Sequence, residues 1–251
     1  MEIGGSRIAL DIALEKEYVS YSSLTRIRDG VTEPFLGNAA TEEGFELHSR
    51  FLEKNKTARV FAYDVEIRLQ KMENALNADA LVSAIMRTSM VELPFDQIVN
   101  GVRCFGRLDI LSNDFVADLK TTSCTTMNAF VASLDFLQAA LYLRVTDRKD
   151  FYYIGICKVA PHNVFVFRVA KFPERMKAAN KELNELLKYV KANSKQKQHG
   201  KDNKEKSSHY GKEDNKRKAK GKRKAKGKSN SIDGHKRSKK TTRKNTSKGR
   251  H

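Results

Sequence analysis

Three residues of the kind that performs metal-dependent hydrolysis, Asp109, Asp118 and Lys120, lie close together in the sequence. They fall in two segments rich in β-favouring residues, 104–111 and 115–122, which a turn-forming Ser-Asn-Asp run separates. We therefore expect a hairpin. With a two-residue loop, Asp109 lies directly opposite Asp118, and the two-residue period of a strand places Lys120 on the same face as Asp118.

A face that carries two opposed carboxylates is a candidate site for a divalent cation. Like charges opposite each other destabilise a sheet by about 0.2–1 kcal/mol per pair, and a cation reverses that sign. Asp109, Asp118 and the backbone carbonyl of Leu119 would supply hard oxygen ligands that suit Mg²⁺, with Mn²⁺ as the alternative. A water in a remaining coordination position is the candidate nucleophile. Lys120 would orient and deprotonate that water and balance the charge of a phosphodiester in the transition state.

The competing interpretation of Asp118 and Lys120 is a surface salt bridge, which any D-x-K sequence can form. The neighbouring residues favour a buried strand instead, because Val116, Ala117 and Leu119 are apolar. Charged groups on buried strands usually have a partner or a task. We therefore favour the catalytic interpretation.

The sequence around these residues resembles the core of a nuclease family. GRLD at 106–109 followed by DLKTT at 118–122 is similar to the GxxD…DxKT core of the PD-(D/E)xK nucleases. That resemblance implies a restriction-endonuclease-like core of class α/β, in which a mixed, twisted sheet of about five strands is flanked by helices.

Three further segments make the chain similar to the RecB-like and RecE-like exonuclease branch, to which the YqaJ and lambda-exonuclease relatives belong. His48 stands in LHSRFLE, Gln138 and Tyr142 stand in QAALY, and SYSSL occupies 20–24. They correspond to a helix with a metal-binding histidine, a Q-xxx-Y motif and an opening S-x-S-x-L. The resemblance covers roughly residues 18–170.

The resemblance assigns roles to residues outside the hairpin. It implies that His48 adds a nitrogen ligand to the metal site, which would help to explain the use of Mn²⁺ as well as Mg²⁺. It implies that Gln138, Tyr142 and Ser22 contact the substrate; the alternative for Tyr142 is a side chain that only completes the core. Glu92 would bind a second cation, or the first cation through water; the alternative for Glu92 is an edge-strand carboxylate in solvent.

The predicted activity is hydrolysis of DNA phosphodiester bonds. Within the resemblance, the best match is a Mg²⁺-dependent exonuclease that digests linear double-stranded DNA in recombination, repair or phage DNA metabolism. Relatives work beside a single-strand annealing protein, and some assemble into rings, so that protein and further copies of this chain are the partners implied besides DNA. Two alternatives stay open, namely a structure-specific or restriction-type endonuclease and a non-catalytic DNA-binding protein that acts through a basic tail.

The helices predicted from apolar periodicity frame this site. A helix over 41–55 has Thr41 as its expected N-cap and places Phe45, His48 and Leu52 on one face. On such an apolar face, a lone histidine is more often a core residue than a metal ligand. The remaining expected elements are a less clear helical segment over 64–88, strands over 90–95, 102–111, 151–159 and 164–169, a helix over 127–145 and a helix that opens at 173.

Charge divides the chain into two parts. Lys and Arg total 48 against 30 Asp and Glu, but 191–251 alone holds 24 basic and 5 acidic residues, so 1–190 is close to neutral. The basic segment contains no Leu, Val, Phe or Met and includes KRKAKG twice in succession. We therefore predict a nuclease domain over 1–190 and a disordered tail over 191–251 that binds a polyanion such as DNA. A nuclear-localisation signal and a merely solvating tail are the alternatives.

Cysteine content and the N-terminal residues bear on location. The three cysteines are odd in number, far apart and without CxxC spacing, which favours reduced structural thiols and argues against the iron–sulfur cluster that some RecB-type nucleases carry. No signal peptide and no apolar run of about 20 residues is expected to direct the chain to a membrane. The predicted location is the cytoplasm of a bacterium or its phage, or the nucleus of a eukaryote.

Overall fold

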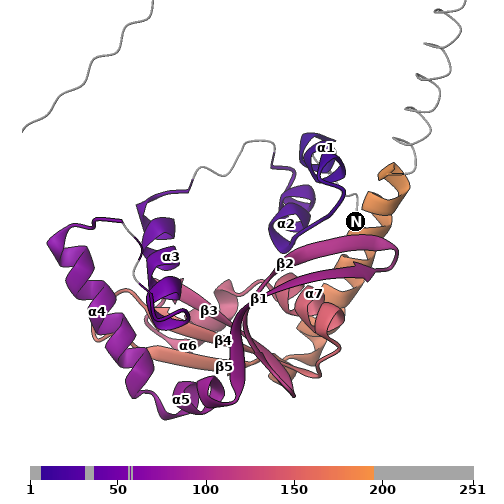
Figure 1. The fold of residues 1–251 in the computed structure, drawn as a ribbon. Coiled ribbons are helices and arrows are strands. Elements are labelled where there is room, and N and C mark those ends of the chain that lie inside the picture. Colours follow the sequence, from indigo (N-terminus) through magenta and orange to yellow (C-terminus); the bar gives the residue numbers. More distant parts are fainter. Residues whose placement is uncertain (1–6, 32–36, 56, 58, 195–251) are drawn as a thin grey trace, which may run out of the picture. The chain divides into compact units, whose positions relative to one another are not determined.

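The structure is a computed structural model that describes residues 7–31, 37–55, 57 and 59–194 (Figure 1). A five-stranded sheet in the order β1-β2-β3-β4-β5 forms its centre. The β3–β4 pair is parallel and the other pairs are antiparallel. The strands are β1 (Ser89–Val99), β2 (Val102–Ser112), β3 (Phe115–Thr122), β4 (Asp150–Cys157) and β5 (Val164–Arg168). The predicted α/β class with a mixed five-stranded sheet is therefore confirmed.

Helices precede the sheet, interrupt it between β3 and β4, and follow it. They are α1 (Arg7–Glu15), α2 (Tyr21–Asp29), α3 (Ala39–Phe51), α4 (Tyr63–Ala78), α5 (Ala80–Arg87), α6 (Met127–Ser133) and α7 (Phe136–Thr146), then the 3₁₀ turn η1 (Val169–Lys171) and a helix over 173–194. The last helix extends four residues into the segment predicted as a tail. The rest of that segment, 195–251, lies outside the described residues.

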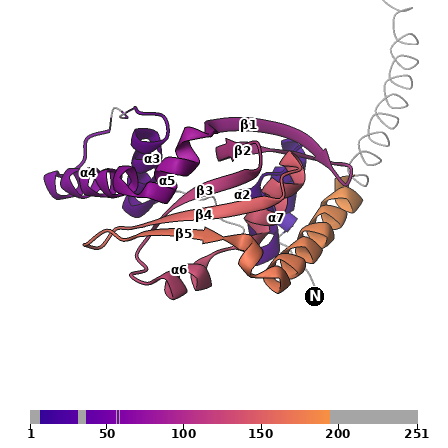
Figure 2. The ribbon, with the colours of Figure 1, turned by 90° about the horizontal axis from the view of Figure 1, so that it is seen from below.

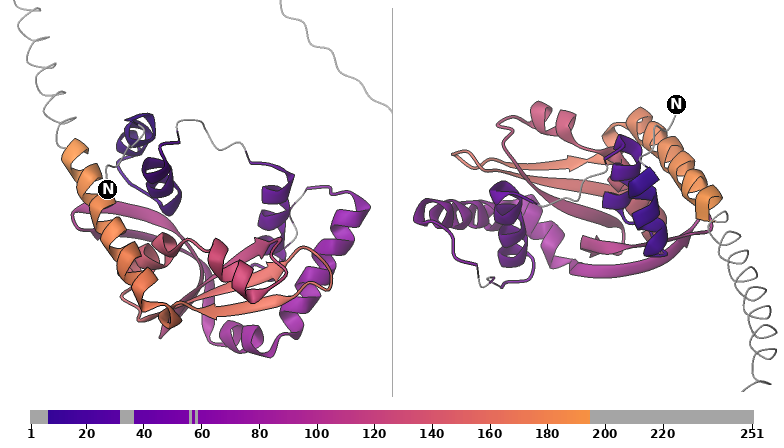
Figure 3. Two further views of the ribbon diagram at one scale, coloured as in Figure 1. Left: turned by 180° about the vertical axis from the view of Figure 1, so that it is seen from behind. Right: turned by 90° about the horizontal axis from the view of Figure 1, so that it is seen from above.

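Two separate hydrophobic cores cover the two faces of the sheet. Helices α3, α4 and α5 pack on one face, and α1, α2, α6, α7 and the last helix pack on the other (Figures 2 and 3). Strand β3 shows the division, because Val116 belongs to the second core whereas Ala117 and Leu119 belong to the first. This alternation is that of a strand buried on both faces.

The β1–β2 hairpin is longer than the sequence predicted. Its turn consists of Asn100 and Gly101, which have φ angles of 54° and 78°, as a two-residue turn matched to strand twist requires. Strand β1 was expected to end near residue 95, but it continues to Val99. It includes Pro94, which an edge strand tolerates because one side of its backbone makes no ladder hydrogen bonds.

The β2–β3 hairpin has the predicted register. Ile110 pairs with Ala117 and Leu111 with Val116, so Asp109 lies opposite Asp118. The backbone ladder does not continue to this opposed pair. Instead the Leu119 N–H donates a 2.9 Å hydrogen bond to Asp109 Oδ2. A side-chain carboxylate thus takes the place of a strand carbonyl where the two strands part.

The helix predicted over 127–145 is divided in two. Helices α6 and α7 meet at a bend of 70°. Asp135 lies in the bend, and its Oδ1 accepts a 3.0 Å hydrogen bond from the Leu137 N–H, which caps α7. An aspartate satisfies the free N–H groups of a new helix better than it continues an old one, so the single-helix prediction is wrong at this residue. The predicted segment over 64–88 is divided in the same way by Asp79, which caps α5.

No single helix of the described ranges has the length and apolar character needed to cross a membrane. The bent pair α6 and α7 meets that test by length and composition when taken together. Its α7 half, however, is packed in the core, with residues 136–142 buried.

Candidate active site

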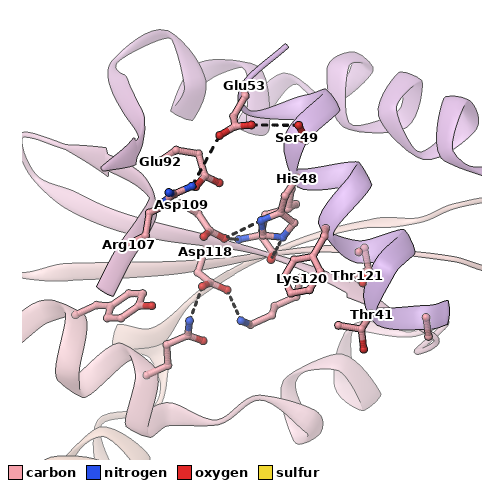
Figure 4. Close-up of a pocket in the computed structure, with 16 residues that line it drawn as sticks. Thr41, His48, Ser49, Glu53, Glu92, Arg107, Asp109, Asp118, Lys120 and Thr121 are labelled. Atoms are coloured by element: carbon pink, nitrogen blue, oxygen red, sulfur yellow. Dashed lines mark hydrogen bonds and ion pairs between the residues drawn. The ribbon is translucent and has the colours of Figure 1, made fainter. Parts of the chain in front are cut away.

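One open pocket of about 500 Å³ gathers most of the predicted site residues (Figure 4). It lies where β2 and β3 part, with α3 on one side and α7 on the other. The predicted residues in its lining are His48, Glu92, Asp109, Asp118, Leu119, Lys120, Gln138 and Tyr142. They come from five elements spread over some 95 positions of the chain, so the fold brings together what the sequence keeps apart.

Three carboxylates from three neighbouring strands line this pocket. Glu92 lies on β1, Asp109 on β2 and Asp118 on β3. The register sets Glu92 opposite Asp109 as well, because Val91 pairs with Ile110 and Leu93 with Leu108 on either side. Asp109 therefore has a carboxylate across from it on both neighbouring strands.

His48 reaches this row from α3. Its Nε2 lies 2.8 Å from the Leu119 carbonyl oxygen, and because a carbonyl can only accept, that nitrogen must carry the proton. The other ring nitrogen, Nδ1, is then a free acceptor 3.6 Å from Asp109 Oδ2. Burial lowers the pKa of His48 more than the nearby Asp118 charge raises it, so the ring is neutral at neutral pH. A neutral imidazole whose second nitrogen donates to a carbonyl is the usual form of a metal-binding histidine.

Helix α3, which carries His48, differs in two details from the prediction. Its N-cap is Asn38, whose Oδ1 accepts a 2.9 Å hydrogen bond from the Thr41 N–H, so Thr41 itself lies inside the helix. Phe45, expected on a shared apolar face with His48 and Leu52, is 61 % exposed, while Leu52 is buried. Phe45 lines the pocket rather than the core.

The ligand atoms of His48, Glu92 and Asp109 all lie within 4.8 Å of one another. Two carboxylates and an imidazole are a donor set that Mg²⁺ and Mn²⁺ both accept, and the nitrogen shifts the preference toward Mn²⁺. All three residues belong to the predicted metal set, which also counted Asp118 and the Leu119 carbonyl. In the structure that carbonyl accepts a hydrogen bond from His48 Nε2.

The ionised form of the Asp109 carboxyl group is electrostatically unfavourable. Burial raises its pKa well above the ordinary value, the charge of Asp118 raises it further, and the ammonium of Lys120 lowers it only in part. The hydrogen bond from the Leu119 N–H is too little to compensate. A divalent cation at this position would remove the cost, since its positive charge favours the ionised carboxylate.

Asp118 is only 2 % exposed and has a different environment on each oxygen. Oδ1 accepts a 2.6 Å hydrogen bond from Gln138 Nε2. Oδ2 lies 2.8 Å from the Lys120 ammonium, yet it accepts no well-formed hydrogen bond from the described residues. A buried carboxylate oxygen left with a lone pair to spare is available for a cation.

Lys120 is held as a cation by its neighbours. Burial alone would lower its pKa, but the charges of Asp118 and Asp109 outweigh burial and raise the pKa above its ordinary value. The side chain therefore carries a full positive charge at neutral pH. In this state Lys120 is suited to stabilising negative charge, and it could accept a proton from water only after a bound cation had offset the aspartates.

Gln138 and Tyr142 lie one turn apart on α7, as predicted, but both are buried. The amide of Gln138 is committed to Asp118. The ring of Tyr142 packs edge-on against Phe95, with 5.7 Å between ring centroids. Burial, followed by the charge of Asp118, raises the pKa of Tyr142, so its hydroxyl remains a donor. Both side chains border the pocket without extending freely into it.

Ser22 lies apart from the other predicted residues. It belongs to the first turn of α2, where its Oγ lies 2.9 Å from the Oγ of Ser20, the N-cap of that helix. It lines a second pocket of about 400 Å³, together with Lys16, Tyr18, Arg26, Phe105 and others. The structure thus brings eight of the nine predicted side chains or carbonyls into one pocket and leaves Ser22 in the neighbouring one.

Arg107 is a site residue that the sequence did not single out. It lines both pockets, and its Nη1 lies 3.2 Å from Glu92 Oε2 and 3.9 Å from Glu53 Oε1. The available signal was its position in the GRLD segment, where it lies two residues before Asp109 and thus on the same side of an extended strand.

Comparison with known proteins supports the fold. No protein-family model and no curated protein sequence matches the chain. Among solved structures, a "Putative exonuclease" from Eubacterium rectale is similar at 13 % identity and a TM-score of 0.51, over 73 % of this chain and 84 % of that one. LHK-Exo in complex with dAMP is similar at 13 % identity over 78 % of this chain and 95 % of that one, with a TM-score of 0.31. At 13 % identity, the likeness to the Eubacterium rectale structure concerns the fold only.

Proposed function

We propose that the protein is a divalent-metal-dependent nuclease, and that it acts as an exonuclease on linear double-stranded DNA. The observation that carries the proposal is the convergence of Glu92, Asp109 and Asp118 from three adjacent strands on His48 from α3, with Lys120 beside them. The fold likeness to a protein described as a putative exonuclease agrees with this proposal.

The residues of the pocket fit a divalent cation. Asp109 has a raised pKa because it is buried and lies near Asp118. His48 offers Nδ1 as a neutral nitrogen ligand. Binding would thus relieve the unfavourable charge of Asp109 in the metal-free site, and Mg²⁺ or Mn²⁺ would be accepted.

Each side chain would have a distinct task in the reaction. The cation, when bound, supplies a water of lowered pKa and positive charge at the phosphoryl oxygens. Glu92 and Asp109 would hold it together with His48. The ammonium of Lys120 faces the same space and would stabilise the charge that develops on the phosphate.

Asp118 would act beside these ligands and depends on α7 for its orientation. Its Oδ1 is fixed by Gln138 at 2.6 Å and its Oδ2 is directed to Lys120 at 2.8 Å. This arrangement keeps the carboxylate from rotating when a substrate enters. The pocket is open to solvent, and Thr41 and Phe45 of α3 and Thr121 of β3 border it, so a polymeric substrate would have access.

The biological setting remains a prediction from the sequence. A role in recombination, repair or phage DNA metabolism, a single-strand annealing partner, assembly of several copies and a cytoplasmic or nuclear location all belong to it. The basic segment from residue 191 onward would add sequence-independent affinity for DNA.

The test is release of acid-soluble nucleotide from linear duplex DNA in Mg²⁺, with a covalently closed circle as the second substrate. Wild type is compared with Lys120→Ala and with Lys71→Ala, which changes an exposed lysine of α4 that does not line the pocket. We expect wild type and Lys71→Ala to degrade the linear DNA and spare the circle, and Lys120→Ala to bind DNA without cutting it.

The other outcomes separate the alternatives. Cutting of both substrates by wild type would establish an endonuclease in place of an exonuclease. Binding without cutting by wild type, with Mg²⁺ and with Mn²⁺, would overturn the nuclease proposal and favour a DNA-binding protein that acts through its basic segment.

A further inference from the structure

Arg107 occupies the boundary between the two pockets. Its side chain is 62 % exposed and lines the candidate active site as well as the second pocket beside α2. Its closest acidic partner is Glu92, at 3.2 Å from Nη1 to Oε2, while Glu53 is farther away at 3.9 Å. The guanidinium thus lies beside two carboxylates of the active-site pocket, of which Glu92 is the nearer, and its remaining surface faces solvent.

Glu92 is held in place by its backbone and is therefore a fixed partner. Its φ angle of 53° lies in the left-handed region, which is rare for a residue inside a strand and is tolerated where the surrounding structure enforces it. This backbone conformation directs the carboxylate into the pocket, where the Glu92 side chain is 16 % exposed. Its ligand oxygen lies within 4.8 Å of the ligand atoms of His48 and Asp109.

A divalent cation and Arg107 therefore compete for the same carboxylate. A cation held by Glu92 would bring two positive charges close to the guanidinium, and like charges repel. Arg107 can respond, since it is long and exposed and its ion pair is of the solvent-accessible kind that costs little to break. Asp109 and Glu92, by contrast, are set by the strands.

The far side of Arg107 is suited to a nucleic-acid strand. The second pocket is lined by Lys16, Arg26 and the exposed ring of Phe105, which packs against Tyr18 with 5.1 Å between ring centroids. Positive charge with aromatic rings is the usual composition of a surface that follows a DNA backbone. A guanidinium at this boundary can bind a phosphate through two parallel N–H groups.

We propose that Arg107 is an exchangeable counter-charge, paired with Glu92 in the metal-free protein, displaced when the cation binds, and then bound to a DNA phosphate at the boundary of the two pockets. This inference rests on the proposed nuclease function. It makes DNA affinity dependent on the cation and explains how the enzyme would avoid holding DNA tightly before its site is complete. Arg107 is in this sense a positioning residue, because it acts on the substrate away from the bond that is cut.

The first measurement is cation binding without DNA, by the loss of the electron-spin-resonance signal of free Mn²⁺. Arg107→Gln removes the competing charge, so we expect it to bind Mn²⁺ roughly 3–10 times more tightly than wild type does. A change of this size in the dissociation constant is what the loss of one modest charge interaction produces. Arg107→Lys keeps a competing charge and should bind Mn²⁺ nearly as wild type does. The matched control is Arg103→Gln, because Arg103 pairs with Asp96 across the same two strands at 2.5 Å but lines neither pocket.

The second measurement is DNA affinity, by fluorescence anisotropy of a labelled linear duplex at fixed ionic strength, in EDTA and in Ca²⁺. In EDTA we expect Arg107→Gln to change the dissociation constant less than about twofold, because Glu92 already occupies the guanidinium. In Ca²⁺ we expect it to weaken binding about tenfold, the usual contribution of one charge-assisted contact to phosphate. Arg107→Lys should weaken binding less than Arg107→Gln does, because lysine keeps the charge and lacks only the second N–H group.

Two results would overturn the inference. One is unchanged or weaker Mn²⁺ binding by Arg107→Gln, which would mean that the ion pair only supports the strands. The other is an equal effect of Arg107→Gln on DNA affinity in EDTA and in Ca²⁺. Failure of the proposed function itself is distinguishable, because wild type would then bind no Mn²⁺ at the pocket or would cut no DNA, whatever residue stood at this position.

Discussion

The side-chain amide of Gln138 donates a 2.6 Å hydrogen bond to Oδ1 of Asp118, and this contact joins α7 to β3 beneath the candidate active site. Both residues are buried, at 4 % and 2 % exposure. Because the other oxygen of Asp118 faces Lys120, Gln138 determines which way the carboxylate is turned. The amide thus orients a carboxylate that we propose to be catalytic, whereas the sequence resemblance implied that the amide contacts the substrate.

The two roles predict different kinetics for Gln138→Ala. If Gln138 orients Asp118, kcat should fall by about 10- to 100-fold, the usual effect of removing a group that orients a metal-site carboxylate, and KM should change little. If it binds the substrate strand, KM should rise instead. The measurement is steady-state digestion of linear duplex DNA. Gln97→Ala, an exposed glutamine of β1, is the control and should match wild type.

Asp109→Asn is expected to stabilise the metal-free protein. Burial and the Asp118 charge raise the pKa of Asp109, so the folded state retains a proton that the unfolded state releases. Stability from this group is therefore full below the ordinary pKa of about 3.8 and is lost as pH rises through the raised pKa. Asparagine can still accept from the Leu119 N–H and carries no charge. The melting temperature of the Asp109→Asn variant in EDTA at pH 7 should exceed that of wild type.

The same substitution should abolish stabilisation by cations. Mn²⁺ should raise the melting temperature of wild type and leave that of Asp109→Asn unchanged, since a ligand stabilises only the state that binds it. For wild type, the rise should diminish as pH falls through the raised pKa of Asp109, because protons compete for the carboxylate. Equal shifts in both proteins would contradict a role for Asp109 in cation binding.

The sequence predicted the β2–β3 hairpin well because two local rules determine it. Turn-forming Asn113 and Asp114 fix a two-residue loop, and the strand period of two then determines which side chains are opposed. The observed pairing of Ile110 with Ala117 follows from these rules alone. Asp109 and Asp118 were placed correctly for the same reason.

The conformation of Glu92 could not be predicted, because it breaks the period on which strand predictions depend. Its positive φ angle lies inside β1, between Val91 and Leu93, which both pair with β2. On the paired strand, Leu108 packs in one core and Ile110 in the other, although a regular strand would direct both to the same face. Such a change of face is decided by the helices packed on either side, and no local pattern encodes it.

Helix α7 illustrates a different limit. Phe130, Leu134, Leu137 and Leu141 keep helical spacing across the bend, so periodicity concealed the break at Asp135, although the capping preference of aspartate was a signal for it. Spacing along α7 also placed Gln138 and Tyr142 one turn apart on the face next to the apolar one, but it carried no information on which partner each would meet.

His48→Ala should weaken Mn²⁺ binding more than Mg²⁺ binding. The imidazole is the single nitrogen donor among the three clustered ligands, and Mn²⁺ accepts nitrogen more readily than Mg²⁺ does. Isothermal titration with each cation gives the ratio of the two affinities, which should shift toward Mg²⁺. Ser49→Ala, on the next position of α3 and also in the pocket lining, should leave the ratio unchanged. An equal loss for both cations would mean that His48 acts through its hydrogen bond to Leu119.

A chain that ends after Ser194 tests the basic segment. It lacks 23 of the 48 lysines and arginines, so its DNA affinity should be lower and should depend less steeply on salt, because fewer counterions are released on binding. The measurement is the slope of the logarithm of the binding constant against the logarithm of salt concentration. Unchanged affinity and slope would contradict a DNA-binding role for the segment.

Helix α2 is fastened to the start of α7 by Asp135. Its Oδ2 accepts hydrogen bonds from the Tyr21 hydroxyl at 3.0 Å and from Arg28 Nη1 at 2.9 Å. Burial raises the pKa of Tyr21, and the charge of Asp135 raises it further, so the hydroxyl remains a donor at neutral pH. Because α7 carries Gln138, this contact links the SYSSL segment to the orientation of Asp118.

Tyr21→Phe is therefore expected to lower the free energy of unfolding by about 0.5–1.5 kcal/mol, the typical net contribution of one hydrogen bond. Asp135→Ala should cost more, about 1–3 kcal/mol, since it also removes the α7 cap and leaves Arg28 with one partner fewer. Urea denaturation measures both. Tyr63→Phe, at a tyrosine that is 81 % exposed, is the matched control and should change nothing. If Tyr21→Phe changed neither the free energy of unfolding nor kcat, the contact between α2 and α7 would have no part in holding the site.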